Sequence, residues 1–147
     1  MSHQMRLKNW KRGESIVMVG FDTGYFVRLL EGNETAVKVW QDLTEGNIDA
    51  VVSPLTFFEL KRLGLKGEIN NKLLEPLFEA IEGICHIVWL NDTDIFTSSA
   101  SISHGTGIPA VDSIILVSCL SMNAKKIYTT DSHFKAYKKE SVSIVVI

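Results

Sequence analysis

The sequence has few of the features that mark a disulfide-stabilised, zinc-binding or membrane-anchored protein. It holds only two cysteines and three prolines in 147 residues. Cys85 and Cys119 lack the paired spacing of a zinc or redox motif. No apolar run is long enough to span a bilayer, and the N-terminus carries no apolar signal region. We therefore expect a cytoplasmic protein with both cysteines reduced and in the core, no disulfide and no membrane anchor.

Net charge is also small, since 15 Lys and Arg side chains oppose 17 Asp and Glu side chains to give −2. This balance excludes a protein that holds a polyanion through bulk positive charge. Lys and Arg are absent between Lys72 and Lys125. Basic residues cluster instead near both ends and in the middle, at Arg6, Lys8, Lys11, Arg12, Lys61, Arg62, Lys66, Lys125, Lys126, Lys135, Lys138 and Lys139. A nucleic acid would have to be bound through such local clusters.

Short β-branched runs alternate with helix-like segments along the chain. The patterns predict strands at 15–21, 50–53, 84–90, 126–130 and 142–147. They predict helices at about 22–31, 33–43, 55–63, 70–81, 92–103 and 109–123, with Gly83 as an interruption and a loop at 104–107. This order is typical of one three-layer α/β/α domain, here 15–147, with a mostly parallel sheet of about five strands. Residues 1–14 are expected to form an N-terminal extension, of which residues 1–4 could be foreign to the natural chain.

Four acidic residues come where the predicted strands end or shortly afterwards. They are Asp22, Glu59, Asp112 and Asp131. In a parallel sheet these positions lie at one edge, where ligands bind. Two carboxylates about 5 Å apart repel by roughly 3 kcal/mol at an effective dielectric near 20, so four ionised carboxylates need a cation. An all-oxygen set without thiolates or clustered imidazoles favours Mg²⁺ or Mn²⁺ over zinc.

Each of these acids also has a purely structural explanation. Asp22 and Asp131 could cap the segments that follow them, and Asp112 could interact with the dipole of its helix. Glu59 could pair with Arg62 one turn later. For a single acid the two explanations are about equally good, and only the joint placement of the four favours a metal site.

Four segments carry these acids in a recognisable order. They are Phe21-Asp22-Thr23, Ser53 through Leu60, Val111-Asp112-Ser113-Ile114-Ile115 and Thr129-Thr130-Asp131-Ser132-His133-Phe134. Together they resemble the motifs of the PIN-domain family, nucleases that include the VapC-type toxins of bacterial and archaeal toxin-antitoxin pairs. The resemblance runs from Ile16 to the C-terminus. No single segment is specific, but the four in the family's order are informative.

The resemblance implies a metal-dependent ribonuclease that hydrolyses RNA phosphodiester bonds. It implies that Asp22, Glu59, Asp112 and Asp131 are both catalytic and metal-binding, with Mg²⁺ or Mn²⁺ as the cofactor. Glu59 would hold or deprotonate the attacking water. The implied biological role is the toxin of a toxin-antitoxin pair, with an RNA substrate and a possible cognate antitoxin as partners.

Two positions depart from the family pattern. Gly24 stands where serine or asparagine is common, and His133 stands where a further acid is frequent. The chain therefore lacks a fifth carboxylate ligand, which bears on the number of bound ions. Thr23, Thr129 and Thr130 could orient carboxylates, but the pattern favours their satisfying turn backbone instead.

Other readings compete with the nuclease. A phosphoacceptor signalling domain needs paired acids after its first strand, and a haloacid-dehalogenase-type phosphatase needs a second aspartate where Gly24 stands. A PIN fold could also be a non-catalytic binding module, or act in RNA processing. Apolar residues after the first strand, including Tyr25, Phe26 and Val37, could form a homodimer surface or a groove for a partner's helix, or belong to the core.

Overall fold

Five parallel strands form the centre of the molecule. A computed structural model describes residues 16–147. Its strands are β1 (Val17–Phe21), β2 (Ile48–Val52), β3 (His86–Ile87), β4 (Lys126–Thr129) and β5 (Ser143–Val146). They lie in the order β3-β2-β1-β4-β5, and every neighbouring pair is parallel. The predicted α/β class is therefore confirmed, and the sheet is parallel throughout.

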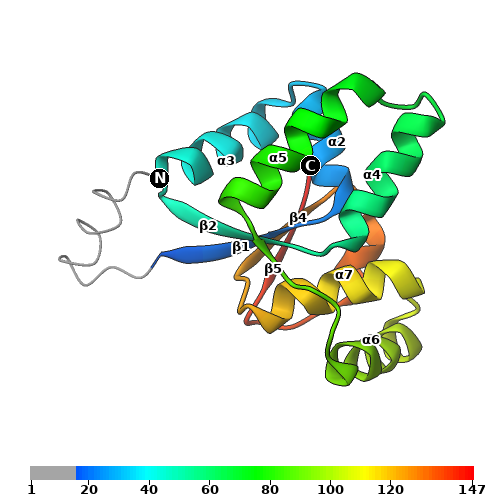
Figure 1. The fold of residues 1–147 in the computed structure, drawn as a ribbon. Helices are drawn as coiled ribbons and strands as arrows, with labels where there is room; N and C mark the ends of the chain where they lie inside the picture. Colours follow the sequence, from blue (N-terminus) through cyan, green and yellow to red (C-terminus); the bar gives the residue numbers. More distant parts are fainter. Residues whose placement is uncertain (1–15) are drawn as a thin grey trace.

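Helices cover both faces of this sheet. They are α2 (Thr23–Leu30), α3 (Glu34–Glu45), α4 (Leu55–Leu65), α5 (Leu74–Ile84), α6 (Thr93–Thr106) and α7 (Ala110–Ser121), with short 3₁₀ turns η1 (Asn71–Leu73) and η2 (Ser132–Ala136). In Figure 1, α2, α3 and α5 lie above the sheet and α6 and α7 lie below it. This arrangement is the predicted three-layer α/β/α fold.

Side chains from the two faces of the sheet contribute to two separate apolar clusters. Val19 and Phe21 of β1 pack with Tyr25 and Phe26 of α2 on one face. On the other face, Val51 and Ile127 pack with Leu116 and Cys119 of α7. Successive strand residues point to opposite faces, so a strand covered on both sides is apolar at nearly every position. This double burial explains the short continuous runs in the sequence.

Strand register places the ends of three strands at one edge of the sheet. Phe21, the last residue of β1, pairs with Val52 of β2 and with Tyr128 of β4. The residues that follow these strands therefore leave the sheet together. The backbone N–H of Asp22 continues the ladder by donating to the Tyr128 carbonyl at 3.2 Å. This edge is where the sequence places its acidic residues.

The third strand is much shorter than predicted. The apolar run at 84–90 suggested a full strand, but only His86 and Ile87 pair, with Val51 and Val52 of β2. At its start β3 is limited by α5, which runs to Ile84, and at its end by β2, which stops at Val52 before Pro54 leads into α4. Trp89 is exposed just beyond it.

Two helices run past the ends that the glycines suggested. α5 contains Gly83 and ends at Ile84, and α6 continues through the predicted loop to Thr106. Gly107 ends α6 with a φ of 79°, a left-handed conformation that glycine adopts without strain. The hydroxyl of Thr106 donates to the Ile102 carbonyl at 2.6 Å, which helps hold this last turn in helical form.

Other expectations concern buried residues. Cys119 is buried and Cys85 half-buried, and both are free thiols, so the prediction of two unpaired cysteines is confirmed. Tyr25 and Phe26 are fully buried in the core, so the idea that they form a dimer surface or partner groove is wrong for these two residues. Both rings pack on Phe21 in the core, Tyr25 stacked with ring centroids 3.8 Å apart and Phe26 edge-on at 5.6 Å.

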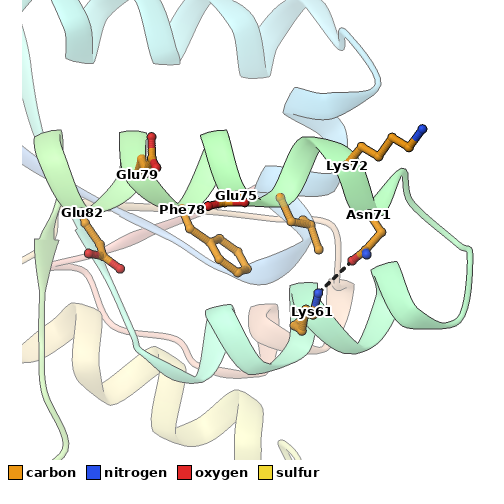
Figure 2. A pocket seen from close by; sticks show the side chains of 8 residues that line it. Lys61, Asn71, Lys72, Glu75, Phe78, Glu79 and Glu82 are labelled. Carbon is orange, nitrogen blue, oxygen red and sulfur yellow. Dashed lines mark hydrogen bonds between the residues drawn. The ribbon is translucent and has the colours of Figure 1, made fainter.

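Two further features concern the surface. Within residues 16–147 no single helix is long and apolar enough to cross a membrane, although α6 and α7, bent by 120° at their junction, meet the length and composition test as a pair. A hollow of about 610 Å³ lies between α4 and α5 (Figure 2). Lys61 donates to Asn71 there at 3.2 Å, and none of the four candidate acids lines it.

Candidate active site

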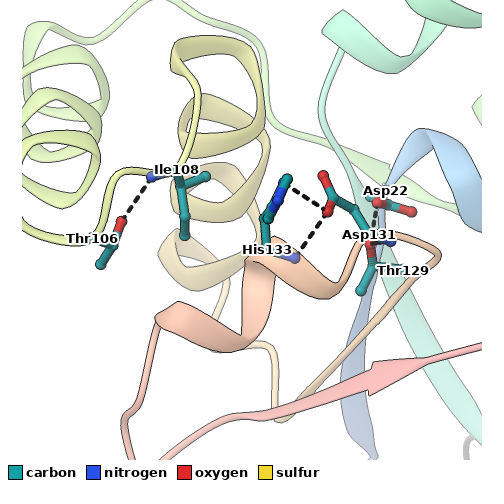
Figure 3. A network of polar contacts seen from close by, with 6 residues as sticks. All are labelled: Asp22, Thr106, Ile108, Thr129, Asp131 and His133. Atoms are coloured by element: carbon teal, nitrogen blue, oxygen red, sulfur yellow. Dashed lines mark hydrogen bonds and ion pairs between the residues drawn. The ribbon is translucent and has the colours of Figure 1, made fainter.

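Asp22 lies at the junction of β1 and α2 and is almost completely buried, with 5% of its surface exposed. One carboxylate oxygen, Oδ1, accepts a hydrogen bond from the backbone N–H of Tyr25 at 3.0 Å and caps α2. The other oxygen, Oδ2, accepts from the hydroxyl of Thr129 at 2.5 Å (Figure 3). Asp22 is thus the helix cap that the sequence suggested and also a fixed, inward-facing carboxylate.

Burial makes ionisation of Asp22 costly. The pKa of Asp22 is raised from 3.8 to about 7, chiefly because the carboxylate is removed from water. The negative charges of Asp112 and Glu59 contribute a smaller part of this rise. The hydrogen bonds from Thr129 and Tyr25 lower the pKa but only partly offset the burial. No Lys or Arg within residues 16–147 forms an ion pair with this carboxylate. A buried acid among other acids without a cationic partner is unusual for a purely structural group.

Glu59 reaches the site from α4. The buried Leu60 packs this helix on the core. Thr56, one turn earlier, accepts a hydrogen bond from the Thr23 hydroxyl at the start of α2 at 3.4 Å. The hydroxyl of Thr23, the first residue of α2, donates to Glu59 Oε1 at 2.6 Å. The alternative explanation, an ion pair between Glu59 and Arg62, is not present in the described part of the chain.

Asp112 lies in the first turn of α7 and is half-buried. Burial raises its pKa above 3.8, and the charges of Glu59 and Asp131 raise it further, whereas His133 lowers it. The preceding Ile108 carbonyl accepts a hydrogen bond from Ser113 at 3.1 Å, which fixes the start of the helix. Asp112 therefore lies close enough to Glu59 and Asp131 for their negative charges to raise its pKa.

Asp131 follows β4 and caps η2. Its Oδ1 accepts from the backbone N–H of His133 at 2.8 Å and lies 3.2 Å from the His133 ring nitrogen Nδ1. The backbone N–H of Asp131 donates to Thr129 Oγ1 at 2.9 Å. The single hydroxyl of Thr129 therefore links Asp131 to Asp22, as Figure 3 shows.

The four predicted acids share one electrostatic neighbourhood at the carboxyl edge of the sheet. Asp22 is affected by Asp112 and Glu59, and Asp112 is affected by Glu59 and Asp131. As the side chains are placed, however, no three His, Cys, Asp or Glu groups in residues 16–147 stand close enough together to hold a metal ion. The donor chemistry suits a hard cation, because every candidate donor is a carboxylate oxygen. The carboxylate side chains would have to move closer together to coordinate one ion.

Threonine hydroxyls do more here than the sequence suggested. The pattern favoured backbone roles for them, yet Thr23 binds Glu59 and Thr129 binds Asp22. Thr129 also accepts the Asp131 N–H, so it fills the predicted turn role as well. Only the strand register, which places Thr129 beside the end of β1, reveals this double use.

Gly24 provides a close approach between α2 and the end of β4. A Cβ atom at this position would lie 2.0 Å from Thr130 Oγ1, 2.9 Å from its Cβ and 3.0 Å from its Cγ2. Thr130 thus occupies the space that a side chain at position 24 would need. The departure of Gly24 from the family pattern therefore has a steric reason in this chain.

We expect Gly24→Ala to lower the free energy of unfolding by about 1–3 kcal/mol, because the added methyl overpacks the site. Gly83→Ala is the matched control, since a Cβ there meets nothing within 4 Å. It should stabilise α5 by about 0.5–1 kcal/mol through helix propensity. Urea denaturation measures both, and Thr130→Gly should recover most of the loss in a double variant. Equal stabilisation by both Gly→Ala changes would contradict this packing.

Two hollows flank the acids. One, of about 190 Å³, is lined by Thr23, Phe58, Glu59, Arg62, Leu63, Lys66 and Val111. The other, of about 300 Å³, is lined by Thr106, Gly107, Ile108, Pro109, Ser132, His133 and Ala136. The sequence did not single out Phe58 or Val111 for this region, and no pattern along the chain marks them as exposed.

Comparisons with known proteins agree with this architecture. No curated protein matches the chain by sequence. Among solved structures, VapBC2 from Rickettsia felis bound to a promoter DNA fragment is similar with a TM-score of 0.65 and 12% identity, over 87% of this chain and 97% of that one. A toxin-antitoxin complex from Klebsiella pneumoniae gives 0.60 and 19%, over 82% and 99%. FitAcB from Neisseria gonorrhoeae gives 0.59 and 24%, over 87% and 96%.

The sequence itself matches a family over most of its length. Residues 19–140 fit the pattern of the PIN domain. This range includes all four candidate acids and every strand except the start of β1 and the whole of β5. The chain therefore belongs to the PIN-domain family.

Proposed function

We propose that the protein is a metal-dependent endoribonuclease that hydrolyses RNA phosphodiester bonds at Asp22, Glu59, Asp112 and Asp131. The observation that carries the proposal is the environment of Asp22. Its carboxylate is buried, surrounded by other acids and without a cationic partner among the described residues. A bound divalent cation would remove this electrostatic penalty. Membership of the PIN-domain family supports a nuclease in general.

Mg²⁺ or Mn²⁺ is the proposed cofactor, because the donors are all carboxylate oxygens. Asp22, Asp112 and Asp131 would hold it, directly or through water. When bound, such an ion lowers the pKa of an attacking water and offsets charge on the scissile phosphate. Asp131 and Glu59 are less buried than Asp22 and have the freedom to turn toward it.

The chain's own residues would then perform the remaining tasks. Glu59, held at Oε1 by Thr23, has its second oxygen available to accept a proton from the attacking water. Thr129 orients the Asp22 carboxylate, and its hydrogen bond to the Asp131 N–H holds the Asp131 backbone close to Asp22. His133 is exposed beside Asp131, where it could contact a substrate phosphate.

The proposed biological role is the toxin of a toxin-antitoxin pair, acting in the cytoplasm. Two of the similar structures are described as VapBC2 and as a toxin-antitoxin complex. By analogy with these complexes, a cognate antitoxin would bind this chain. The homodimer expected from the sequence is also part of the proposal. The alternative roles, an RNA-processing factor and a non-catalytic PIN-fold binding module, share the same fold.

Cleavage of a labelled RNA panel tests the proposal. We expect cleavage with Mg²⁺ or Mn²⁺, none with chelator, and a loss in Asp131→Asn of about 100-fold or more, typical of removing a metal-site carboxylate. Glu59→Gln should lose about 100- to 10,000-fold if it transfers the proton. Asp94→Asn, an exposed acid in the first turn of α6, is the control and should cleave like the wild type. If Asp131→Asn and Glu59→Gln cleave as well as Asp94→Asn, these two acids have no part in the reaction and the proposed four-carboxylate site is wrong.

A further inference from the structure

Two exposed apolar side chains line the hollow beside Glu59. Phe58, one position before Glu59 on α4, is 65% exposed, and the exposed Val111 of α7 lines the same hollow. Its neighbour Phe57 is half-buried instead and packs edge-on against Phe78 at 5.1 Å. The exposed ring of Phe58 beside a candidate active site leaves an aromatic face on which a ligand can stack.

Two positively charged residues, Arg62 and Lys66, lie on the same side of α4 as Phe58. Arg62 and Lys66 follow Phe58 at intervals of four residues, which places all three on one helix face. Both side chains are exposed and line the hollow. Neither forms an ion pair with any other residue of the described range 16–147. The hollow is therefore lined by an aromatic ring, two cations without an ion-pair partner in the described range, and a candidate catalytic carboxylate.

We propose that this hollow is the subsite for one unpaired nucleotide next to the scissile phosphate. Phe58 stacks on the base, and Arg62 and Lys66 bind the backbone phosphates beyond it. The proposal rests on the proposed ribonuclease function and deepens it by assigning residues that select single-stranded substrate.

Size and chemistry favour a single nucleotide over other occupants. The volume of about 190 Å³ is below the roughly 300–1,000 Å³ of pockets that take drug-sized ligands, so it suits one base. Bases within an A-form duplex are stacked on each other, and only an unpaired base can stack on a protein ring. The two cations match phosphate charge, and Glu59 lines the same hollow.

Fluorescence anisotropy with a short labelled single-stranded RNA in chelator tests the subsite without cleavage. We expect Phe58→Ala to weaken binding about 5- to 100-fold, the range for losing one stacked base. Phe58→Trp should retain affinity, whereas Phe58→Leu should not. The matched control is Phe96→Ala, since Phe96 is also exposed, at 45%, but lines a different hollow between α6 and α7. A labelled duplex of the same sequence should bind equally to the wild type and to Phe58→Ala.

The cations are tested by salt dependence. Arg62→Gln and Lys66→Gln should each reduce the slope of log Kd against log salt by about 0.7, the value for one phosphate contact on a single strand. Lys38→Gln, an exposed lysine on α3, controls for the charge change and should leave the slope unchanged.

Separate outcomes distinguish this subsite from the hydrolysis. If the RNA panel is not cleaved but Phe58→Ala still weakens single-strand binding relative to Phe96→Ala, the subsite stands and the hydrolysis proposal fails. If cleavage needs the acids but these two variants bind alike, the subsite is wrong. Absence of RNA binding by the wild type also overturns it. So does a change from dimer to monomer in Phe58→Ala by sedimentation, since that identifies a protein interface.

Discussion

Replacing Asp22 with asparagine is expected to abolish metal-dependent RNA cleavage and at the same time to stabilise the metal-free protein. At pH 8 in chelator we expect the free energy of unfolding to rise by roughly 2 kcal/mol. Function and stability are expected to change in opposite directions because the ionised carboxylate binds the metal that cleavage needs but lowers the free energy of unfolding when no metal is bound. Few variants of a mainly structural residue would show both effects.

The magnitude follows from the burial of Asp22. A pKa raised from 3.8 to about 7 corresponds to about 4 kcal/mol against the ionised form, at 1.36 kcal/mol for each pKa unit. Asparagine keeps the cap, because its carbonyl oxygen can still accept from the Tyr25 N–H. The hydroxyl of Thr129 loses its acceptor, which costs about 1–3 kcal/mol and leaves the smaller net gain.

Asp94→Asn is the control for this prediction. Asp94 is exposed on α6 and lies outside the acidic neighbourhood, so its removal should change stability by less than about 0.5 kcal/mol. Urea denaturation at pH 8 in chelator measures both variants. A loss of stability in Asp22→Asn larger than in Asp94→Asn would mean that its hydrogen bonds outweigh its burial, contrary to the proposal.

The metal-free protein is expected to lose stability as the pH rises from about 4 to 7. The folded-state pKa of Asp22 lies above its unfolded value of 3.8, so the folded state retains a proton that the unfolded state has released. Stability from this group is therefore full below pH 3.8 and is lost as pH rises through about 7. Asp112 contributes in the same direction, since burial also raises its pKa.

Urea unfolding in chelator at pH 5.5 and pH 8 measures this dependence. The wild type should be less stable at pH 8, and Asp22→Asn should remove most of the difference. Mn²⁺ should restore stability at pH 8 far more than at pH 5.5, because an ion needs the ionised carboxylate and displaces its proton. A wild type whose stability does not fall between the two pH values would contradict the charge environment of Asp22.

The positions of the acids could be predicted because they depend on short patterns. The apolar run of β1 ends at a polar residue, and Asp22 follows it as a helix cap. Glu59 and Asp112 fall in the helices that follow Pro54 and Pro109. Since the strands are parallel, their ends lie at one edge whatever the details of packing.

Contacts between elements could not be predicted in the same way. Phe57 and Phe58 are adjacent and identical in kind, yet one packs on Phe78 and the other is exposed. The direction of each ring depends on where α5 lies against α4, which no local pattern contains. The bridging role of Thr129 similarly depends on the register that pairs Phe21 with Tyr128.

Calorimetric titration of the chelator-treated protein with Mn²⁺ at pH 8 tests the central claim most directly. The wild type should bind one or two ions, Asp94→Asn should bind like the wild type, and Asp22→Asn should lose the binding. Binding by the wild type should also weaken as the pH falls below about 7, the pKa of Asp22. The same heat of binding in the wild type and Asp22→Asn, or no binding by the wild type, would contradict a metal site built on these carboxylates.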